Sequence, residues 1–233
     1  NAYTNMMAVW VLCRALEILG ILSDMRRTEL TMQLGISRND IDRWEDISRR
    51  MYLPFHQDGI LSQFEGYETL REFNWEDYRT RYGNIQRLDL ILEAEHDSPN
   101  HYKLSKQADV LMLFYLFSSE ELAELFSRLG YPFEYDTIPR NVAYYTARLS
   151  HGSTLCRVAC SWVLARSDRP RAMNLFTEAL QSDVNDIQQG TTAEGIHLGA
   201  MAGTVDLVQR VSTGIEVKNE ALRLNPELPQ EIG

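Results

Sequence analysis

Apolar residues return every three or four positions along most of the chain, which is the spacing of an amphipathic helix. The first stretch shows it most clearly, because apolar residues recur there at this spacing and form one stripe: Met6, Val9, Trp10, Cys13, Leu16 and Leu19. The same period, read with residue types that start and end helices, predicts about eight helices and a mainly α fold. Beyond the first, they cover residues 40–51, 87–95, 106–117, 119–129, 154–166, 170–181 and 191–210.

Residue types that cap helices mark several of the expected ends. Ser118 with Glu121 has the spacing of a capping box, in which a hydroxyl and a carboxylate satisfy free backbone N–H groups. Thr191 with Glu194 repeats this spacing, and Pro170 suits the first turn of a helix. The polar turns fall at alternating ends of the helices, so we expect antiparallel helix pairs.

Residues 53–105 lose the helical period and gather aromatic residues and carboxylates. So long an irregular stretch inside a compact domain is usually functional, and a short helix over 87–95 is the one regular element expected in it. Aromatic rings offer flat apolar faces to a sugar ring, and a pair of carboxylates could act as acid and base, although spacing alone pairs none of them. Examples are Phe73, Trp75, Tyr78, Tyr82, Asp58, Glu65 and Glu95.

Short alternation replaces the helical period after Gly214. Residues 215–217 and 221–224 alternate apolar and polar side chains, and Pro226 and Pro229 follow them, which indicates a β segment or a linker. We therefore predict a helical domain over residues 1–212 and the beginning of a β segment or a linker over residues 213–233.

Composition and charge narrow the class of protein. The chain has 233 residues, of which 44% are hydrophobic and 24% charged, as in an ordinary globular protein. Its 33 acidic and 23 basic residues give a net charge of −10, which repels phosphodiester backbones, so no nucleic acid partner is expected. No uninterrupted apolar stretch approaches the roughly 18 residues that span a membrane, so no membrane contact is expected.

The chain has three cysteines, which is a small and odd number and therefore does not suit a disulfide framework. This favours a reducing compartment and a cytoplasmic protein. Cys156 and Cys160 stand four apart on one helix face and could be half of a metal site. A zinc site needs two more ligands, so two cysteines packed in the core are the better interpretation. We predict no metal. The helical pattern also begins at once, without an initiator Met, so we expect the chain to be part of a longer polypeptide.

Two turns combine hydroxyls, glycine and an expected helix start, where free N–H groups and the helix dipole favour an anion. They are residues 150–153, Ser-His-Gly-Ser, and residues 190–192, Gly-Thr-Thr. Ordinary helix capping explains either turn taken singly. Having two such turns, with His151 and His197 nearby, strengthens a phosphate site as the alternative to capping.

Lys106 and Gln107 open an apolar helix beside the aromatic stretch. A lysine and an amide can hydrogen-bond sugar hydroxyls, although a solvated lysine at a helix start would look the same. Glycine-rich phosphate loops and the common catalytic motifs do not occur in the chain.

Three stretches, in this order and at wide spacing, carry a resemblance to a known family. Residues 1–5 are Asn-Ala-Tyr-Thr-Asn, residues 106–110 are Lys-Gln-Ala-Asp-Val, and residues 194–204 contain Glu-Gly-Ile-His and Met-Ala-Gly-Thr. With these the chain resembles glycoside hydrolase family 65, the inverting phosphorylases of maltose, trehalose, kojibiose or nigerose. The resemblance implies the C-terminal part of an (α/α)6 barrel, followed by a β cap.

The resemblance also implies roles for individual residues. Lys106 and Gln107 would contact the transferred glucosyl unit, and Ser150, Gly152 and Ser153 with His197 would hold phosphate. The general acid would be a glutamate upstream of Asn1, so the chain by itself would be inactive. Inorganic phosphate would be the co-substrate, with no cofactor, and the products would be β-glucose 1-phosphate and glucose.

Two other functions stay open at this point. A hydrolase on the same barrel would use a carboxylate such as Glu194 to activate water. An α-helical interaction module would use its paired helices as a groove, and both turns would be ordinary caps. The expected partners of the phosphorylase are the disaccharide, phosphate, the N-terminal remainder of the polypeptide and a second copy in a homodimer.

Overall fold

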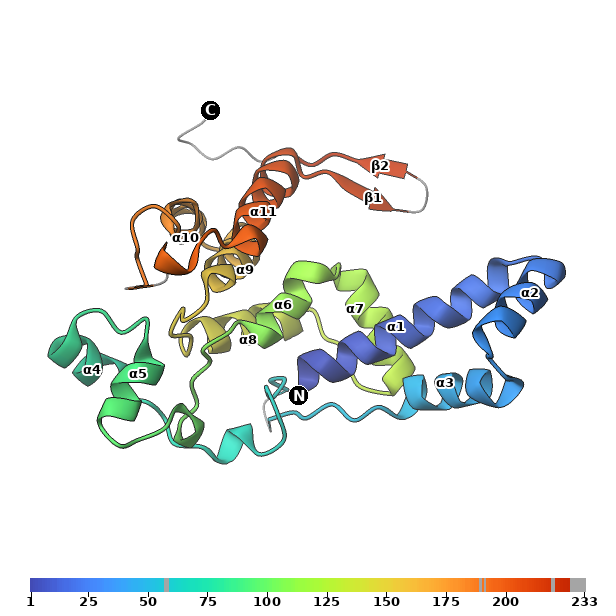
Figure 1. The fold of residues 1–233 in the computed structure, drawn as a ribbon, viewed down its shortest axis with the longest axis horizontal. Helices are drawn as coiled ribbons and strands as arrows, with labels where there is room; N and C mark the ends of the chain where they lie inside the picture. The colour runs from blue at the N-terminus through green and yellow to red at the C-terminus, as the bar shows by residue number, and fades with distance from the viewer. Residues whose placement is uncertain (57–58, 189, 191, 219–220, 227–233) are drawn as a thin grey trace. The chain divides into compact units, whose positions relative to one another are not determined.

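The computed structural model describes residues 1–56, 59–188, 190, 192–218 and 221–226. Within these residues the chain forms eleven α-helices and one two-stranded hairpin, so the predicted mainly α fold is confirmed (Figure 1). The chain divides into two compact units. Unit 1 comprises Asn1–Tyr67 and Leu116–Ile138, and unit 2 comprises Glu68–Tyr115 and Pro139–Gly233.

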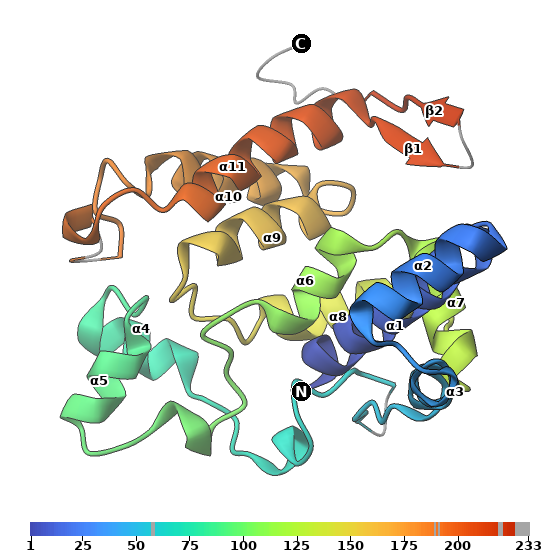
Figure 2. The same ribbon diagram turned by 45° about the vertical axis from the view of Figure 1, so that its right-hand side comes forward.

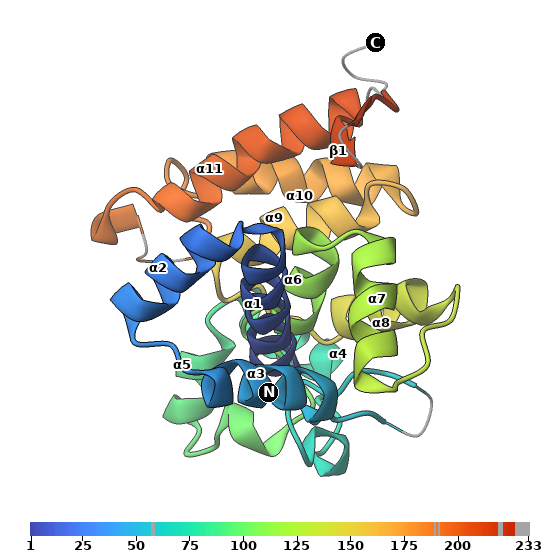
Figure 3. The same cartoon turned by 90° about the vertical axis from the view of Figure 1, so that its right-hand side faces the viewer.

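Unit 1 is built around α1 (Ala2–Ile21), which packs against α3 (Arg38–Arg50) and α7 (Ser119–Leu129) (Figure 3). The predicted apolar face of the first helix is confirmed. Its buried residues are Ala2, Met6, Val9, Cys13 and Leu19. Arg14 and Glu17 interrupt its apolar run, but by length and composition alone this helix of 20 residues is long and apolar enough to cross a membrane.

The ends of α3 and α7 follow the capping chemistry of the sequence. Ser37 with Asp40, and Ser118 with Glu121, form complete capping boxes. A further helix, α2 (Asp24–Leu34), was not predicted. Ser23 caps its start and Gly35 ends it in a left-handed conformation, but none of its residues is buried. Because a helix without a buried face carries no apolar period, the pattern does not reveal it.

In unit 2, three helices lie side by side: α9 (Thr154–Leu164), α10 (Arg169–Gln181) and α11 (Leu198–Leu207) (Figure 2). Pro170 stands in the first turn of α10, as predicted. Gly203 of α11 lies directly against α9, where a Cβ atom on this glycine would be 2.7 Å from Val158 Cγ1. Small residues therefore let α11 approach α9 closely.

Two predicted boundaries in unit 2 are wrong. Helix α6 runs over Asp109–Leu116, so Lys106 and Gln107 lie ahead of the helix and do not open it. The backbone N–H of Ser105 donates to the Arg148 carbonyl, which holds this segment in a bridge. The helix expected from residue 191 begins only at Leu198, after a 3-10 turn over Thr192–Glu194. Thr191 and the Glu194 side chain lie outside the described residues.

The stretch 53–105 is more regular than predicted. It contains α4 (Trp75–Tyr82) and α5 (Leu88–Ala94), of which only the second was expected. Short 3-10 turns occupy Tyr67–Thr69 and Pro99–His101. Much of its aromatic content forms a small core of its own, in which Trp75, Tyr78 and Tyr102 pack on buried residues. Those buried residues are Phe73, Leu88, Leu92 and Leu104.

Helix α8 (Thr137–Thr146) was also not predicted, and a π-helical turn over Val208–Ser212 extends α11. Beyond it, β1 (Glu216–Lys218) pairs antiparallel with β2 (Ala221–Arg223), and Val217 faces Leu222 in the register. The β segment expected after Gly214 is therefore confirmed. The domain boundary between residues 212 and 213 stays a prediction, and Asp58 and Pro229 lie outside the described residues.

Candidate functional site

A bridge in unit 2 brings two distant segments together. Ser105 pairs in parallel with Leu149, and the Ser150 backbone N–H donates to the Ser105 carbonyl at 3.0 Å. The segment that carries Lys106 therefore lies beside the turn 150–153, although more than forty residues of chain separate them. We call this turn, with Lys106, the candidate site.

The Lys106 residue is fixed at three points. The Cys156 thiol donates to its carbonyl oxygen at 3.4 Å, and its ammonium Nζ lies 2.7 Å from Asp89 Oδ2. Its stem crosses the turn so closely that a Cβ atom on Gly152 would lie 2.8 Å from Lys106 Cγ. Glycine at position 152 therefore makes room for the lysine. Gln107 is exposed beside it.

The turn itself has an unusual backbone. His151 has a φ of 56°, in the left-handed region that non-glycine residues seldom adopt. The buried Gln188 side chain donates to the His151 carbonyl at 2.9 Å and so supports this conformation. Ser153 is the N-cap of α9, but its side chain makes no capping hydrogen bond within the described structure. Ser153 thus differs from Ser118, whose hydroxyl caps α7 by accepting from the Glu121 backbone N–H.

Three buried polar atoms around this turn have no hydrogen-bond partner in the described part of the chain. They are Gln86 Oε1, His151 Nδ1 and Arg157 Nη1, and within the described residues of unit 2 no other buried side-chain polar atom is in this state. A buried donor or acceptor without a partner costs free energy. Their gathering at one turn is typical of a polar site that a ligand completes.

The surroundings of His151 are positively charged. Burial and the nearby guanidinium groups of Arg157, Arg171 and Arg79 lower the pKa of His151 to about 4, so the imidazole is neutral at pH 7. Arg157 is fully buried, and its Nε donates to Glu178 Oε2 of α10 at 2.9 Å. Cations from α4, α9 and α10 thus influence one turn, which suits an anion.

His197 stands at the start of α11 and is held by one carboxylate. Asp183 accepts from the His197 backbone N–H at 2.9 Å with one oxygen and contacts the ring Nδ1 at 2.5 Å with the other. The hydrogen bond with His197 holds the pKa of Asp183 below its usual range. The loop that carries Asp183 also carries Gln188, which binds the His151 carbonyl. His197 and the turn are therefore tied to the same loop.

The second predicted anion turn already holds an anion from the chain itself. The Asp186 carboxylate accepts from the backbone N–H of Gly190 at 2.8 Å, and from the Thr192 N–H and hydroxyl at 3.1 Å each. The turn 190–192 thus has the anion affinity that the sequence indicates. Because Asp186 satisfies these donors, the prediction of a ligand site at this turn has no support in the structure.

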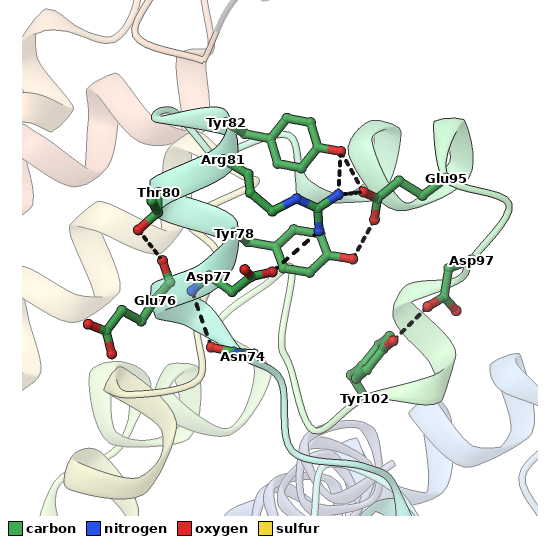
Figure 4. A network of polar contacts seen from close by, with 10 residues as sticks. All are labelled: Asn74, Glu76, Asp77, Tyr78, Thr80, Arg81, Tyr82, Glu95, Asp97 and Tyr102. Carbon is green, nitrogen blue, oxygen red and sulfur yellow. Dashed lines mark hydrogen bonds and ion pairs between the residues drawn. The ribbon is translucent and has the colours of Figure 1, made fainter.

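Glu95, at the end of α5, is one of the carboxylates considered for acid and base roles. Figure 4 shows its carboxylate surrounded by Tyr78, Tyr82 and Arg81 of α4. Both tyrosine hydroxyls donate to it at 2.5 Å. Burial and the hydrogen bond to Glu95 raise the pKa of Tyr78 to about 12. These contacts tie α4 to α5, which indicates a structural role.

Asp97 is held in the same manner two residues later. It accepts from the Tyr102 hydroxyl at 2.6 Å (Figure 4). Its other carboxylate oxygen contacts His101 Nδ1 at 2.6 Å. The hydrogen bonds from Tyr102 and His101 hold the pKa of Asp97 far below its usual range. Two carboxylates of the aromatic stretch are thus engaged in local structure.

The cysteines are packed as predicted. Cys156 and Cys160 are free thiols that are buried in α9, and burial raises the pKa of Cys156 to about 11. Within the described residues, no three His, Cys, Asp or Glu side chains gather as a metal site would require.

Comparison with known proteins decides the family. Residues 1–206 match the model of the glycosyl hydrolase family 65 central catalytic domain. The chain belongs to glycosyl hydrolase family 65. The match includes α1, so this apolar helix is part of the family 65 catalytic domain.

Several family 65 proteins are similar to the chain over nearly its whole length. It is 56% identical to an uncharacterized glycosyl hydrolase of Mycobacterium tuberculosis, over 100% of the chain and 18% of that protein. It is 32% identical to the trehalose 6-phosphate phosphorylase of Lactococcus lactis, over 99% of the chain and 29% of that enzyme. The chain therefore spans less than a third of these relatives.

The fold has a counterpart among solved structures. A protein described as a kojibiose phosphorylase from the human microbiome has a TM-score of 0.73 to the chain at 22% identity, over 99% of the chain and 30% of that protein. The helical fold of the chain is thus that of a family 65 protein.

The residues predicted for the site fall into three groups. Lys106, Ser150, Gly152 and Ser153 lie together at the candidate site, and His197 is connected to it through the loop 183–197. Gln107 is next to Lys106 in the chain, and its side chain is exposed.

The sequence analysis missed three residues at the candidate site: Gln86, Asp89 and Arg157. Arg157 is four residues after Ser153 and therefore on the same helix face, which is a signal that the spacing did contain. Gln86 lies in the loop before α5 and Asp89 in the first turn of α5, and their approach to the Lys106 segment depends on the fold.

Proposed function

We propose that the full-length protein is an inverting phosphorylase that cleaves an α-linked glucose disaccharide to β-glucose 1-phosphate. Relatives named as trehalose 6-phosphate phosphorylase, kojibiose phosphorylase and 1,2-alpha-glucosylglycerol phosphorylase support a phosphorolytic reaction. The first of these names makes a phosphorylated disaccharide a substrate to test beside maltose, trehalose, kojibiose and nigerose.

The observation that carries the proposal is the unsatisfied polar character of the turn 150–153. Its Ser153 hydroxyl does not cap α9, and Arg157 Nη1 behind it has no partner in the described structure. Free N–H groups at the start of an eleven-residue helix add to these donors. Such a set of donors favours phosphate over the water that a hydrolase would bind.

In the proposed reaction, phosphate bound at this turn attacks the anomeric carbon of the glucosyl unit from the face opposite the leaving group. A new bond forms between a phosphate oxygen and the anomeric carbon, and the bond from that carbon to the glycosidic oxygen breaks with inversion. A general acid protonates the departing oxygen. We propose that residues outside this chain supply that acid.

Residues of the candidate site would orient the two reactants. Ser150, Ser153 and the Gly152 backbone would hold phosphate oxygens together with His197, while Lys106 and Gln107 would bind glucosyl hydroxyls. Phosphate is already anionic at neutral pH, so it needs a donor-lined site and no catalytic base. The reaction requires no cofactor under this proposal.

The carboxylates that the contacts bring to the turn support this choice over hydrolysis. Asp89 holds Lys106, Asp183 holds His197, and Glu178 holds Arg157. A hydrolase would need a carboxylate to activate water, either one of these three or Glu194, whose side chain lies outside the described residues. Asp89, Asp183 and Glu178 each already compensate a cation or an imidazole, which suits positioning better than base catalysis.

The exposed apolar residues of α1 and α2 suggest a partner for unit 1. Val11, Ile18, Ile21 and Met25 are all at least half exposed. We propose that the remainder of the same polypeptide covers them and completes the helical barrel, and that the protein, with its three free thiols, is cytoplasmic and dimeric.

One experiment tests the proposed function. The full-length protein is incubated with each disaccharide and with trehalose 6-phosphate, with and without inorganic phosphate, and anomeric products are followed by proton NMR. Phosphate-dependent β-glucose 1-phosphate is the expected result. Free glucose released at an equal rate without phosphate would contradict it and identify a hydrolase.

A further inference from the structure

The ion pair between Lys106 and Asp89 has no role in the reaction as described above. Lys106 Nζ lies 2.7 Å from Asp89 Oδ2, with about half of the lysine side chain exposed. The other carboxylate oxygen, Oδ1, lies 3.3 Å from Arg87 Nε. Burial opposes the charge of Asp89, but the hydrogen bonds from Lys106 and Arg87 hold its pKa below the usual range. Asp89 is therefore an ionised hydrogen-bond acceptor at the candidate site.

The loop between α4 and α5 places this carboxylate against the turn 150–153. The Gln86 carbonyl oxygen would lie 3.3 Å from a Cβ atom on Gly152, so the loop contacts the turn directly. The Gln86 side-chain oxygen, Oε1, is buried and without a partner in the described structure. The Gln86 backbone N–H donates to Asn84 Oδ1 at 3.0 Å, and this hydrogen bond fixes the loop.

A sugar ring presents neighbouring hydroxyls, each of which is both a donor and an acceptor. Lysine can only donate and an ionised carboxylate can only accept. A lysine and a carboxylate held side by side can therefore bind two adjacent hydroxyls at once, one through its oxygen and the other through its hydrogen. Charge-assisted hydrogen bonds of this kind are stronger than neutral ones.

We propose that Asp89 is a sugar-binding residue, which accepts a hydrogen bond from the glucosyl hydroxyl adjacent to the one that Lys106 contacts. The buried Gln86 side-chain oxygen is a second acceptor, in the loop just before α5. This inference rests on the proposed function in one respect, since it takes Lys106 as a ligand of the glucosyl unit. The alternative is that Asp89 only neutralises Lys106.

The test compares Asp89→Asn with wild type in the full-length protein. The matched control is Glu72→Gln, because Glu72 of unit 2 also pairs with a lysine and an arginine, at 3.5 Å from Lys103 and 3.2 Å from Arg148. Saturation-transfer NMR and calorimetry measure binding of glucose and of its 2-, 3-, 4- and 6-deoxy analogues. Thermal melting checks that both variants fold, and Asp89→Glu serves as a second variant if Asp89→Asn does not.

In wild type, one deoxy analogue is expected to bind at least about tenfold more weakly than glucose, the loss typical of a charged hydrogen bond. In Asp89→Asn, glucose itself should weaken to a similar degree, and removal of the same hydroxyl should cause little further loss. Glu72→Gln should keep the wild-type pattern. If Asp89→Asn discriminates among the analogues as wild type does, Asp89 is not a sugar ligand and the inference is overturned.

The failure of this inference is distinguishable from that of the proposed function. Sugar binding is measured without phosphate and without turnover, so its outcome does not depend on the reaction type. A hydrolase in the NMR assay could still show the Asp89 signature, and a phosphorylase could lack it.

Discussion

The turns 150–153 and 190–192 have similar sequences and opposite states. Both contain hydroxyls and glycine, and each is associated with a left-handed residue that is not glycine, His151 with a φ of 56° and Asp186 with a φ of 45°. In the second turn the Asp186 carboxylate satisfies the backbone donors. In the first, buried polar atoms of His151 and Arg157 lack partners within the described residues.

The difference teaches what decides whether such a turn binds a ligand. Hydroxyls, glycine and N–H groups create affinity for an anion in both turns. A carboxylate four residues before Gly190 satisfies it internally. The first turn instead lies under the influence of the guanidinium groups of Arg157, Arg171 and Arg79, and in the proposed function its affinity is left for phosphate. The second turn is therefore an internal reference for the first.

The largest expected effect concerns the pH dependence of the first turn. The pKa of His151 is lowered to about 4 in the folded protein, from 6.5 when unfolded, so protonation favours the unfolded state. The stabilising contribution is complete above pH 6.5 and is lost as the pH falls through 4. The free energy of unfolding should drop by about 3 kcal/mol from this residue.

Chemical denaturation of the full-length protein between pH 7 and pH 4, in phosphate-free buffer, measures this drop. His151→Asn serves as the comparison, because Asn tolerates a left-handed φ and does not titrate. Between pH 7 and pH 4, the free energy of unfolding of the variant should fall by about 3 kcal/mol less than that of wild type. If the free energies of unfolding of the two proteins fell in parallel with pH, the imidazole of His151 would not be buried in its neutral form.

The next effect concerns the second turn. Asp186→Ala removes the acceptor for the N–H groups of Gly190 and Thr192, and should lower the free energy of unfolding by about 2 kcal/mol. Asp186→Asn keeps one acceptor oxygen and should lose less. Denaturation at pH 7 measures both variants. Stabilities equal to wild type would mean that the turn does not depend on its internal anion.

A third change tests the crowding at the first turn. Ala at position 152 would place a Cβ atom 2.8 Å from Lys106 Cγ, so the lysine stem must move. Gly152→Ala should therefore raise KM for the disaccharide about tenfold, the effect of losing about one charged hydrogen bond. Gly199→Ala is the control, since no atom lies within 4 Å of a Cβ there. Equal KM values for both variants would remove Lys106 from the sugar site.

The smallest effect separates capping from ligand binding. Ser153 makes no capping bond within the described residues, so Ser153→Ala should change stability by less than about 0.5 kcal/mol, whereas Ser118→Ala should cost about 1 kcal/mol. The first variant should raise KM for phosphate about fivefold, and the second should leave it unchanged. A large stability loss in Ser153→Ala would restore the interpretation of Ser153 as an ordinary cap.

Residue patterns predicted those parts of the fold that have one buried face. The first helix and the helices over 154–166 and 170–181 were found because burial gives them an apolar period. Helices α2 and α4 were missed because none of their described residues is buried. The helix predicted from Lys106 begins only at Asp109, because the segment before it pairs with another segment: the Ser105 backbone N–H donates to the Arg148 carbonyl.

At both turns, residue types indicated affinity for an anion, but not whether a side chain of the protein already satisfies the donors. Sequence could propose anion binding at both turns, yet only the fold places Asp186 inside one of them. It could single out Lys106, but Asp89 reaches it from the first turn of α5, seventeen residues earlier. The remaining roles of Lys106, Gln107 and His197 came from the family resemblance, because spacing alone does not assign them.

The contact of Gly203 with Val158 has a consequence for how this protein could be re-engineered. It sets the separation between α11, which begins after His197, and α9, which begins after Ser153. Positions 158 and 203 therefore act as a spacer between the two helices, and neither belongs to the turn 150–153. Libraries that vary the sizes of these two side chains offer a route to a wider or narrower separation of the two helix starts without altering a residue of that turn.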